Sequence, residues 1–120
     1  MRVGVDLIEI ERIRAALDRF PQFRERCFTE AEREYCDSRK NPAESYAGRF
    51  AGKEAVGKAL GIGVRFTWKE IEIVGRPKPS VRLSGRTAAW AEKTHAAQID
   101  LSMTHSRELA AAICVVTDGA

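Results

Sequence analysis

The sequence of 120 residues has no long apolar run and no recognisable leader. No stretch approaches the roughly 18 apolar residues that a membrane-spanning helix needs. The first residues, MRVGVDLIEIE, bring in an acidic side chain at position 6 and lack the apolar segment of a signal peptide. We therefore expect a cytoplasmic protein that does not contact a membrane.

Cysteine is scarce, and several common functional motifs are missing. Cys27, Cys36 and Cys114 are odd in number and fit no zinc spacing, so we expect free thiols in a reducing compartment. There is no GxGxxG motif, no Walker motif and no serine in a nucleophile-elbow setting. These absences weigh against zinc proteins, dehydrogenases, nucleotide hydrolases and serine hydrolases.

The charges are nearly balanced and mixed along the chain. Twenty Lys and Arg face 17 Asp and Glu, which gives a net charge of +3 with no basic stripe or tail, so nucleic acid is not an expected partner. Hydrophobic residues make up 44% of the sequence, as expected for a single globular domain over residues 1–120. So short a domain has little room for a deep pocket, and a large ligand would be held partly by a neighbouring copy.

Periodicity and turn residues predict an α+β fold, with a mainly antiparallel sheet packed on helices in the order βαααββαββ. Thr29 and Glu32 form a capping box that opens one helix, and Gly61 ends another. An apolar stripe of Ile10, Ile13, Leu17 and Phe20 is expected to face the core from the first helix. The predicted strands are 3–8, 66–74, 81–83, 99–104 and 109–116, and the predicted helices are 9–20, 30–38, 43–60 and 86–91.

The helix predicted at 43–60 combines small residues on several faces with four charged side chains. Glycine and alanine let other elements approach closely all round, so we expect the helix to be largely buried. Its charges, Arg49, Lys53, Glu54 and Lys58, would then need counter-charges or ligands. The alternative is an exposed helix in which Glu54 and Lys58 form an ordinary i,i+4 pair.

Asp6 is a carboxylate within an apolar strand, where burial without a partner is costly. It could simply cap the following helix. Alternatively, Asp6 and Glu54 together supply the one or two carboxylates by which Mg²⁺ is bound when substrate phosphates and water complete its shell. His105, next to Thr104 at the end of a strand, is either structural or a donor to a phosphate.

Five segments in order resemble the holo-acyl-carrier-protein synthase family, the short bacterial type of phosphopantetheinyl transferase. They are VGVDLIEIERI, FTEAEREYC, RFAGKEAVGKALG, WKEIEI with the later GRP, and LSMTHSRELAAAICVV. The resemblance implies transfer of 4'-phosphopantetheine from coenzyme A to a serine of apo acyl carrier protein, with release of adenosine 3',5'-bisphosphate. It also implies magnesium and a homotrimer with its sites between subunits. Such carriers serve both fatty acid biosynthesis and polyketide synthesis, and the residues fit either.

The resemblance also assigns roles to individual residues. Asp6 and Glu54 would bind magnesium, with Glu54 acting as the base or orienting a water, and Lys58 would balance charge on the leaving phosphate. Arg49, Lys53 and His105 would hold phosphates, including the 3'-phosphate, with Thr104 beside them. The backbone from Gly75 to Pro77 would pack on the adenine in a site shared with the next subunit.

A docking site for the acidic carrier is implied on the first helix. Arg12 matches a family arginine that pairs with an acidic residue beside the carrier serine, and Arg19, Phe23 and Arg26 are weaker matches. An ordinary solvated helix face is the alternative. Two other functions stay open for the whole chain: a non-enzymatic trimeric module that binds coenzyme A or an acidic protein, and a magnesium-dependent diphosphate hydrolase.

Overall fold

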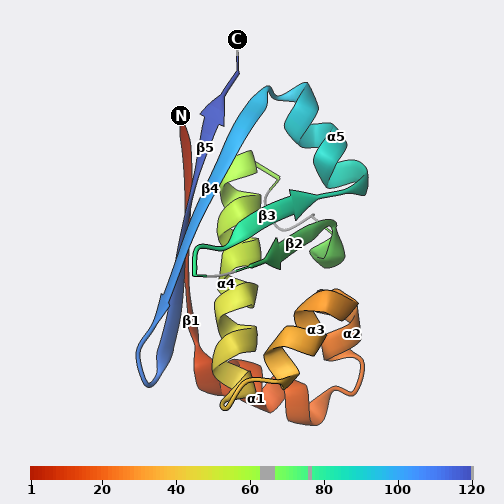
Figure 1. Cartoon of the computed structure of the whole chain (residues 1–120), viewed down its shortest axis with the longest axis vertical. Coiled ribbons are helices and arrows are strands. Elements are labelled where there is room, and N and C mark those ends of the chain that lie inside the picture. Colours follow the sequence, from red (N-terminus) through yellow and green to blue (C-terminus); the bar gives the residue numbers. More distant parts are fainter. Residues whose placement is uncertain (63–66, 76, 120) are drawn as a thin grey trace.

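A three-stranded antiparallel sheet with a long helix packed across it forms the centre of the structure (Figure 1). The computed structural model describes residues 1–62, 67–75 and 77–119. Strand order in the main sheet is β1-β5-β4, and β2 pairs with β3 in a separate hairpin. The elements are β1 (Arg2–Glu9), α1 (Ile10–Arg19), α2 (Phe23–Cys27), α3 (Glu30–Asp37), α4 (Pro42–Leu60), the 3-10 helix η2 (Trp68–Glu70), β2 (Ile71–Val74), β3 (Ser80–Leu83), α5 (Gly85–Lys93), β4 (Ala96–His105) and β5 (Leu109–Asp118).

Strand β1 lies against α4 at unusually short range because of one glycine. A Cβ at Gly4 would lie 1.9 Å from the carbonyl oxygen of Ala55 and 2.6 Å from the amide nitrogen of Ala59. Both neighbours are helix backbone, which cannot move aside. Side chains alternate along a strand, so Asp6 lies on the same helix-facing side as Gly4 and Ile8. This packing brings Asp6 to α4.

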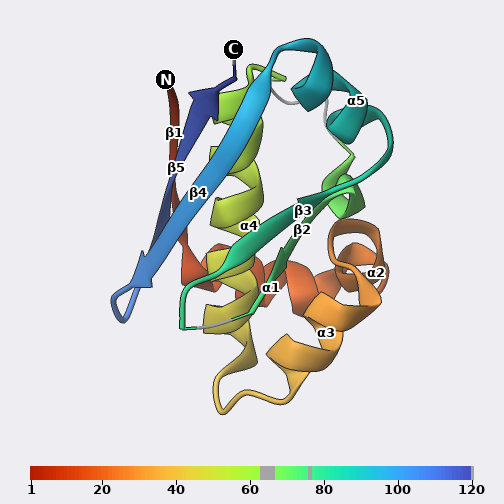
Figure 2. The ribbon, with the colours of Figure 1, turned by 45° about the horizontal axis from the view of Figure 1, so that its top comes forward.

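Helix α4 is buried on nearly all sides, as its small residues predicted. It begins with Pro42 in the first turn and ends at Gly61, whose φ of +76° is the left-handed conformation that favours glycine. The main sheet covers one side, and the β2–β3 hairpin lies on the other (Figures 1 and 2). Its twelve buried residues include the two cations Arg49 and Lys53.

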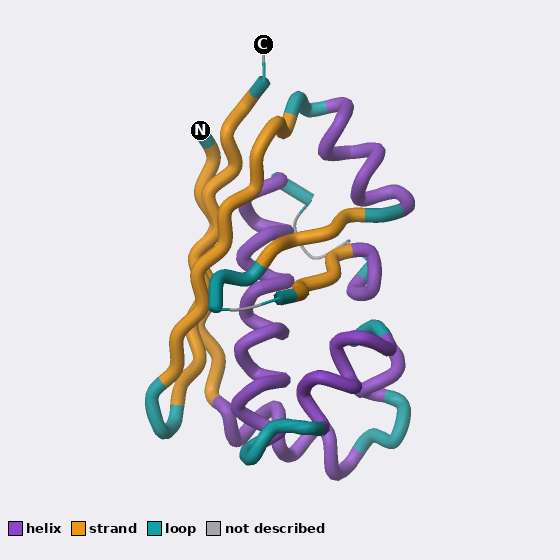
Figure 3. The backbone as a smooth tube through the Cα atoms, viewed as in Figure 1, coloured by secondary structure: helices purple, strands orange, loops and turns teal. Residues whose placement is uncertain are grey.

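The described helices all lie on the same side of the main sheet (Figure 3). The outer face of the sheet is therefore bare. Its side chains are apolar on β1 and β5, whereas β4 contributes polar ones (Gln98, Asp100, Ser102 and Thr104). Val3, Val5 and Leu7 of β1 are 56%, 60% and 63% exposed, and Ile113 of β5 lies opposite Val5. None of the described helices combines the length and the apolar composition needed to cross a membrane.

The predicted α+β class and the antiparallel pairing are confirmed, with differences at three places. Helix α2 was not predicted, so four helices separate β1 from β2. Strand β2 starts at Ile71, because Trp68–Glu70 form a 3-10 turn, and residue 66 lies outside the described residues. The predicted apolar stripe of α1 is wrong at Phe20, which is 60% exposed because the helix ends at Arg19. The three cysteines are free and buried, as predicted.

Candidate active site

Two carboxylates from different elements meet where β1 crosses α4. The side chain of Asp6 is only 11% exposed, and Glu54 lies close enough to interact with it. Burial raises the pKa of Glu54, and the neighbouring Asp6 carboxylate raises it further, because two negative charges in one partly dry site repel each other. This crowding is the signature of a site that gains from a cation.

Lys58 partly compensates the pair. Its Nζ lies 3.2 Å from Oδ1 of Asp6 and donates to the carbonyl oxygen of Val5 at 2.9 Å. The Glu54–Lys58 pair within the helix is therefore not the arrangement observed. Asp6 does not cap α1 either, because the residue at the cap position is Glu9 and it makes no side-chain cap bond.

Arg12 of α1 belongs to the same neighbourhood. Its charge lowers the pKa of Glu54, as Lys58 does, although both effects are smaller than those of burial and Asp6. Arg12 itself is exposed. It therefore links the outward face of α1 electrostatically to the carboxylate pair.

The carboxylate pair fits a magnesium ion. Both donors are hard oxygens, and their number matches the one or two carboxylates that Mg²⁺ takes from a protein. Burial and the neighbouring Asp6 raise the pKa of Glu54, so a bound cation would stabilise the ionised pair. Within the described part of the chain, no three His, Cys, Asp or Glu side chains gather, so the donor set is unlike that of a zinc site.

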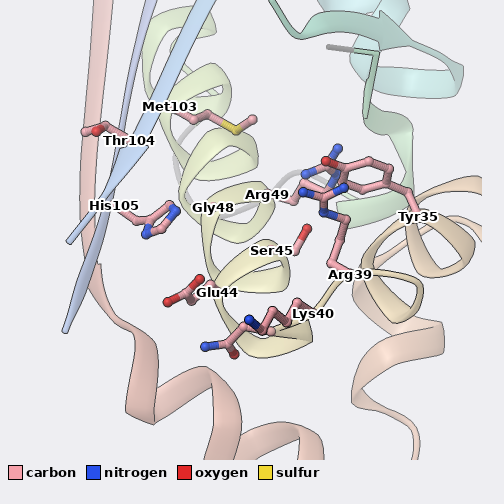
Figure 4. A pocket seen from close by; sticks show the side chains of 11 residues that line it. Tyr35, Arg39, Lys40, Glu44, Ser45, Gly48, Arg49, Met103, Thr104 and His105 are labelled. Atoms are coloured by element: carbon pink, nitrogen blue, oxygen red, sulfur yellow. The ribbon is translucent and has the colours of Figure 1, made fainter. Parts of the chain in front are cut away.

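A pocket of about 580 Å³ opens beside the N-terminal half of α4 (Figure 4). Thr104 and His105 at the end of β4 form one wall, and residues of α3 and the following loop form the other. Arg49 of α4 is buried on the side of α3, with its guanidinium carbon 4.2 Å from the centre of the Tyr35 ring. Two of the predicted phosphate ligands, Arg49 and His105, thus face the same pocket, whereas the side chain of Thr104 points away from it (Figure 4).

Sequence reasoning missed several residues of this pocket. Arg39 and Lys40 add two cations from the loop before α4, and Tyr35 supplies an aromatic wall. The only signal in the sequence was the adjacent pair of cations just before the Asn41-Pro42 break. The remaining lining residues are Asn41, Glu44, Ser45, Gly48 and Met103. Four basic side chains against one carboxylate make the pocket suited to an anion.

Lys53 corrects the sequence prediction. Its side chain is fully buried, and its Nζ lies 2.7 Å from Oε1 of Glu32, whose side chain is also fully buried. The same ammonium donates to the carbonyl oxygens of Trp68 and Ile71 at 2.9 and 2.5 Å. Burial lowers the pKa of Lys53, and Glu32 opposes that shift. The ammonium has no route to a phosphate, so the predicted phosphate role is wrong and the group is structural.

The other predicted residues lie outside the pocket and the carboxylate pair. Pro77 is exposed in the β2–β3 connection and does not line the pocket of its own chain. Arg19 and Arg26 are exposed on α1 and α2. Phe23 is half-buried, with its ring 6.1 Å from that of Phe50 and 6.0 Å from that of Phe28.

Comparison with known proteins bears directly on this arrangement. A family model described as the 4'-phosphopantetheinyl transferase superfamily matches residues 2–114. The chain belongs to this superfamily. The protein is thus an enzyme, a phosphopantetheinyl transferase.

Curated relatives of this transferase are similar over almost their full length. It is 42% identical over 120 residues to the holo-[acyl-carrier-protein] synthase of Caldanaerobacter subterraneus subsp. tengcongensis, with 98% of this chain and 94% of the relative covered. It is 46% identical over 119 residues to the holo-[acyl-carrier-protein] synthase of Clostridium acetobutylicum, with 95% of this chain and 94% of that relative covered.

Solved structures agree in fold. The Helicobacter pylori holo-[acyl-carrier-protein] synthase in complex with coenzyme A matches with a TM-score of 0.84 at 30% identity, covering 96% of this chain and 99% of that one. The ACPS-CoA complex of Chronobacterium ammoniagenes matches with a TM-score of 0.86 at 27% identity. The match covers 99% of this chain and 98% of that one.

Proposed function

We propose that the protein transfers 4'-phosphopantetheine from coenzyme A to a serine hydroxyl of an apo acyl carrier protein and releases adenosine 3',5'-bisphosphate. The observation that carries the proposal is the Asp6–Glu54 carboxylate pair, with Lys58 beside it and a basic pocket on the same helix. Family membership and relatives named for this activity support it. The buried free thiols fit a reducing compartment, so we place the reaction in the cytoplasm.

In this reaction the serine oxygen bonds to the phosphorus that carries pantetheine, and the bond from that phosphorus to the bridging diphosphate oxygen breaks. The serine proton passes to Glu54, directly or through a water that Glu54 orients. Lys58, whose side chain is 52% exposed, can turn toward the departing 5'-phosphate and balance its growing charge. Positioning and charge neutralisation, rather than covalent catalysis, are what phosphoryl transfer requires.

Asp6 and Glu54 would hold the magnesium ion that the reaction requires. When bound, Mg²⁺ neutralises the diphosphate and orients it for in-line attack. Arg49 and His105, with Thr104 beside them, would bind the nucleotide end of coenzyme A in the basic pocket. Pro77 would contact the adenine bound by a neighbouring subunit.

The bare face of the main sheet supports the proposal of a homotrimer. Monomeric proteins seldom expose a continuous apolar patch of this kind. The patch runs across two paired strands, since Val3 lies opposite Val115, Val5 opposite Ile113 and Leu7 opposite Ala111.

The experiment that tests the function is a single incubation of the protein with coenzyme A, Mg²⁺ and a purified apo carrier, followed by mass spectrometry of the carrier. We expect a mass gain of one phosphopantetheine per carrier serine, abolished by EDTA and by replacing the carrier serine with alanine. Free phosphopantetheine without a modified carrier would identify a diphosphate hydrolase instead. An unchanged carrier and unchanged coenzyme A would identify a binding module.

A further inference from the structure

Arg49 is a buried cation that the described residues leave without a hydrogen-bonding partner. Only 6% of the residue is exposed, and its Nε is the one buried side-chain polar atom in the described part of the chain that makes no hydrogen bond. No carboxylate of the described residues forms an ion pair with it. A buried guanidinium without such partners binds an external anion strongly. The anion supplies the hydrogen bonds and the counter-charge that water, excluded from this position, does not supply.

The ring of Tyr35 substitutes for the missing counter-ion. The guanidinium carbon of Arg49 lies 4.2 Å from the ring centre, well inside the range of a cation–π interaction, and that of Arg39 lies at 5.5 Å. Figure 4 shows the three side chains gathered on the wall opposite Thr104 and His105. An aromatic ring stabilises a cation without neutralising it. Arg49 therefore keeps its full charge for a ligand, which a carboxylate partner would have cancelled.

Tyr35 cannot easily move away, because α3 is anchored at its first turn. The Thr29–Glu32 capping box is complete on both sides, and the second oxygen of Glu32 accepts from the amide of Ile73 at 2.8 Å. The other oxygen faces the buried ammonium of Lys53. The helix that carries Tyr35 is thus fastened both to α4 and to β2.

The phosphate bound here would not be the one that reacts. From α4 the pocket is lined by Glu44, Ser45, Gly48 and Arg49, but not by Glu54 or Lys58, and Asp6 does not line it either. Arg49 precedes Glu54 by five residues, about 7.5 Å along a helix axis. Given the proposed function, on which this inference rests, the reacting diphosphate lies at the carboxylate pair, so the pocket receives the 3'-phosphate at the far end of the nucleotide.

We propose that Tyr35 is a positioning residue for substrate selection: its ring holds Arg49 in a charged, unpaired state and so makes the enzyme prefer coenzyme A over 3'-dephospho-coenzyme A. Tyr35 then contributes to the KM for coenzyme A and not to kcat. Loss of the ring should weaken binding only for a substrate that carries the 3'-phosphate.

The test is steady-state transfer by the full-length protein with coenzyme A and, separately, 3'-dephospho-coenzyme A. In Tyr35→Leu we expect the KM for coenzyme A to rise about 3- to 30-fold, the range that a desolvated cation–π contact supports, with kcat within about twofold. The KM for 3'-dephospho-coenzyme A should stay unchanged, and Tyr35→Phe, which keeps the ring, should retain the preference for coenzyme A. In an Arg49→Gln background, Tyr35→Leu should have no further effect.

A second comparison keeps the size of the ring constant and so holds even if Tyr35→Leu does not fold. Pentafluorophenylalanine at position 35 reverses the ring quadrupole relative to phenylalanine, and we expect at least about a threefold higher KM for coenzyme A. Equal KM values for these two rings, or an equal penalty for both substrates, would overturn the role of Tyr35. A wild-type protein that makes holo carrier but does not distinguish the two substrates would also overturn it, while the proposed function would stand. Absence of transfer by the wild type would instead refute the function.

Discussion

Burial of Glu54, together with the neighbouring Asp6 carboxylate, lowers the stability of the metal-free protein at neutral pH. Because the pKa of Glu54 in the folded state is raised, the unfolded chain loses this proton first as the pH rises from about 4.3, and the free energy of unfolding then falls until the folded group has ionised too. Glu54→Gln should therefore increase stability to urea at pH 7 and have little effect at pH 3.

The same variant should lose transfer by about a hundredfold or more, as expected when a group that stabilises the transition state is removed. Mg²⁺ should raise the urea midpoint of the wild type and not that of the variant. Glu92→Gln, on the exposed surface of α5, is the matched control and should change none of these quantities. An equal stability gain at pH 3 and pH 7 would contradict carboxylate ionisation as the cause.

Lys53 provides a prediction of the opposite kind, because its charge serves the fold. Removing one partner of a buried ion pair leaves the other unpaired, and Lys53→Met should cost about 3–5 kcal/mol in the free energy of unfolding, measured by urea denaturation. The folded fraction should keep its KM for coenzyme A. A tenfold rise in that KM with an unchanged free energy of unfolding would instead support the phosphate-binding role that the sequence predicted for Lys53.

Glu54 and Lys53 show which parts of the site can be predicted from the sequence alone. The charges on a helix of small residues correctly predicted that counter-charges would be needed, and Asp6 and Glu54 were paired as expected. The partner of Lys53 could not be predicted, because Glu32 lies 21 residues earlier on another helix and its place in a capping box already explained it. Tyr35 gave no sign of its proximity to Arg49, since only the packing of α3 on α4 creates that contact.

Among the elements, α1 is the one that a carrier protein would meet. Arg12 is exposed, lies in the first turn of the helix that follows the strand holding Asp6, and acts electrostatically on Glu54. Arg12→Glu should raise the KM for the carrier by about tenfold, with a smaller rise for Arg19→Glu and none in the KM for coenzyme A, because charges at the rim of an interface steer association. The rise should shrink as salt is added, since salt screens exposed charges.

Arg14→Glu is the matched control on the same helix. Arg14 lies about 200° around the axis from Arg12 and pairs with Glu11, so its reversal should leave carrier kinetics unchanged. Equal effects of the two reversals would show a general response to charge and would refute a docking site centred on Arg12.

The elements themselves were predictable where a local signal existed. The capping box at Thr29 and the glycine at 61 both fixed helix ends that the structure confirms. Helix α2 was missed because it has only five residues and follows Pro21, which leaves too short a stretch for a helical period to show. The start of β2 was placed too early because Trp68 has a side chain typical of strands, while its backbone forms a 3-10 turn.

For the whole molecule, the bare apolar face of the main sheet leads to a prediction about assembly. We expect light scattering to give the mass of a trimer. A charge at the centre of the face, in Ile113→Arg, should give monomers and reduce transfer by at least about tenfold if the site is completed by a neighbour. Ala89→Arg places the same charge on exposed α5, away from the sheet, and should leave the trimer intact. A fully active wild-type monomer would contradict this assembly.

The two ends of the chain leave the fold together. Arg2 lies opposite Val116 in the sheet, and the ammonium of Met1 forms an ion pair with Asp118 at 3.2 Å. Both ends lie at the end of the sheet away from α1 (Figure 1). A sensor chip or a fluorescent label attached through either terminus would therefore hold the enzyme with α1 and the basic pocket directed toward the solution.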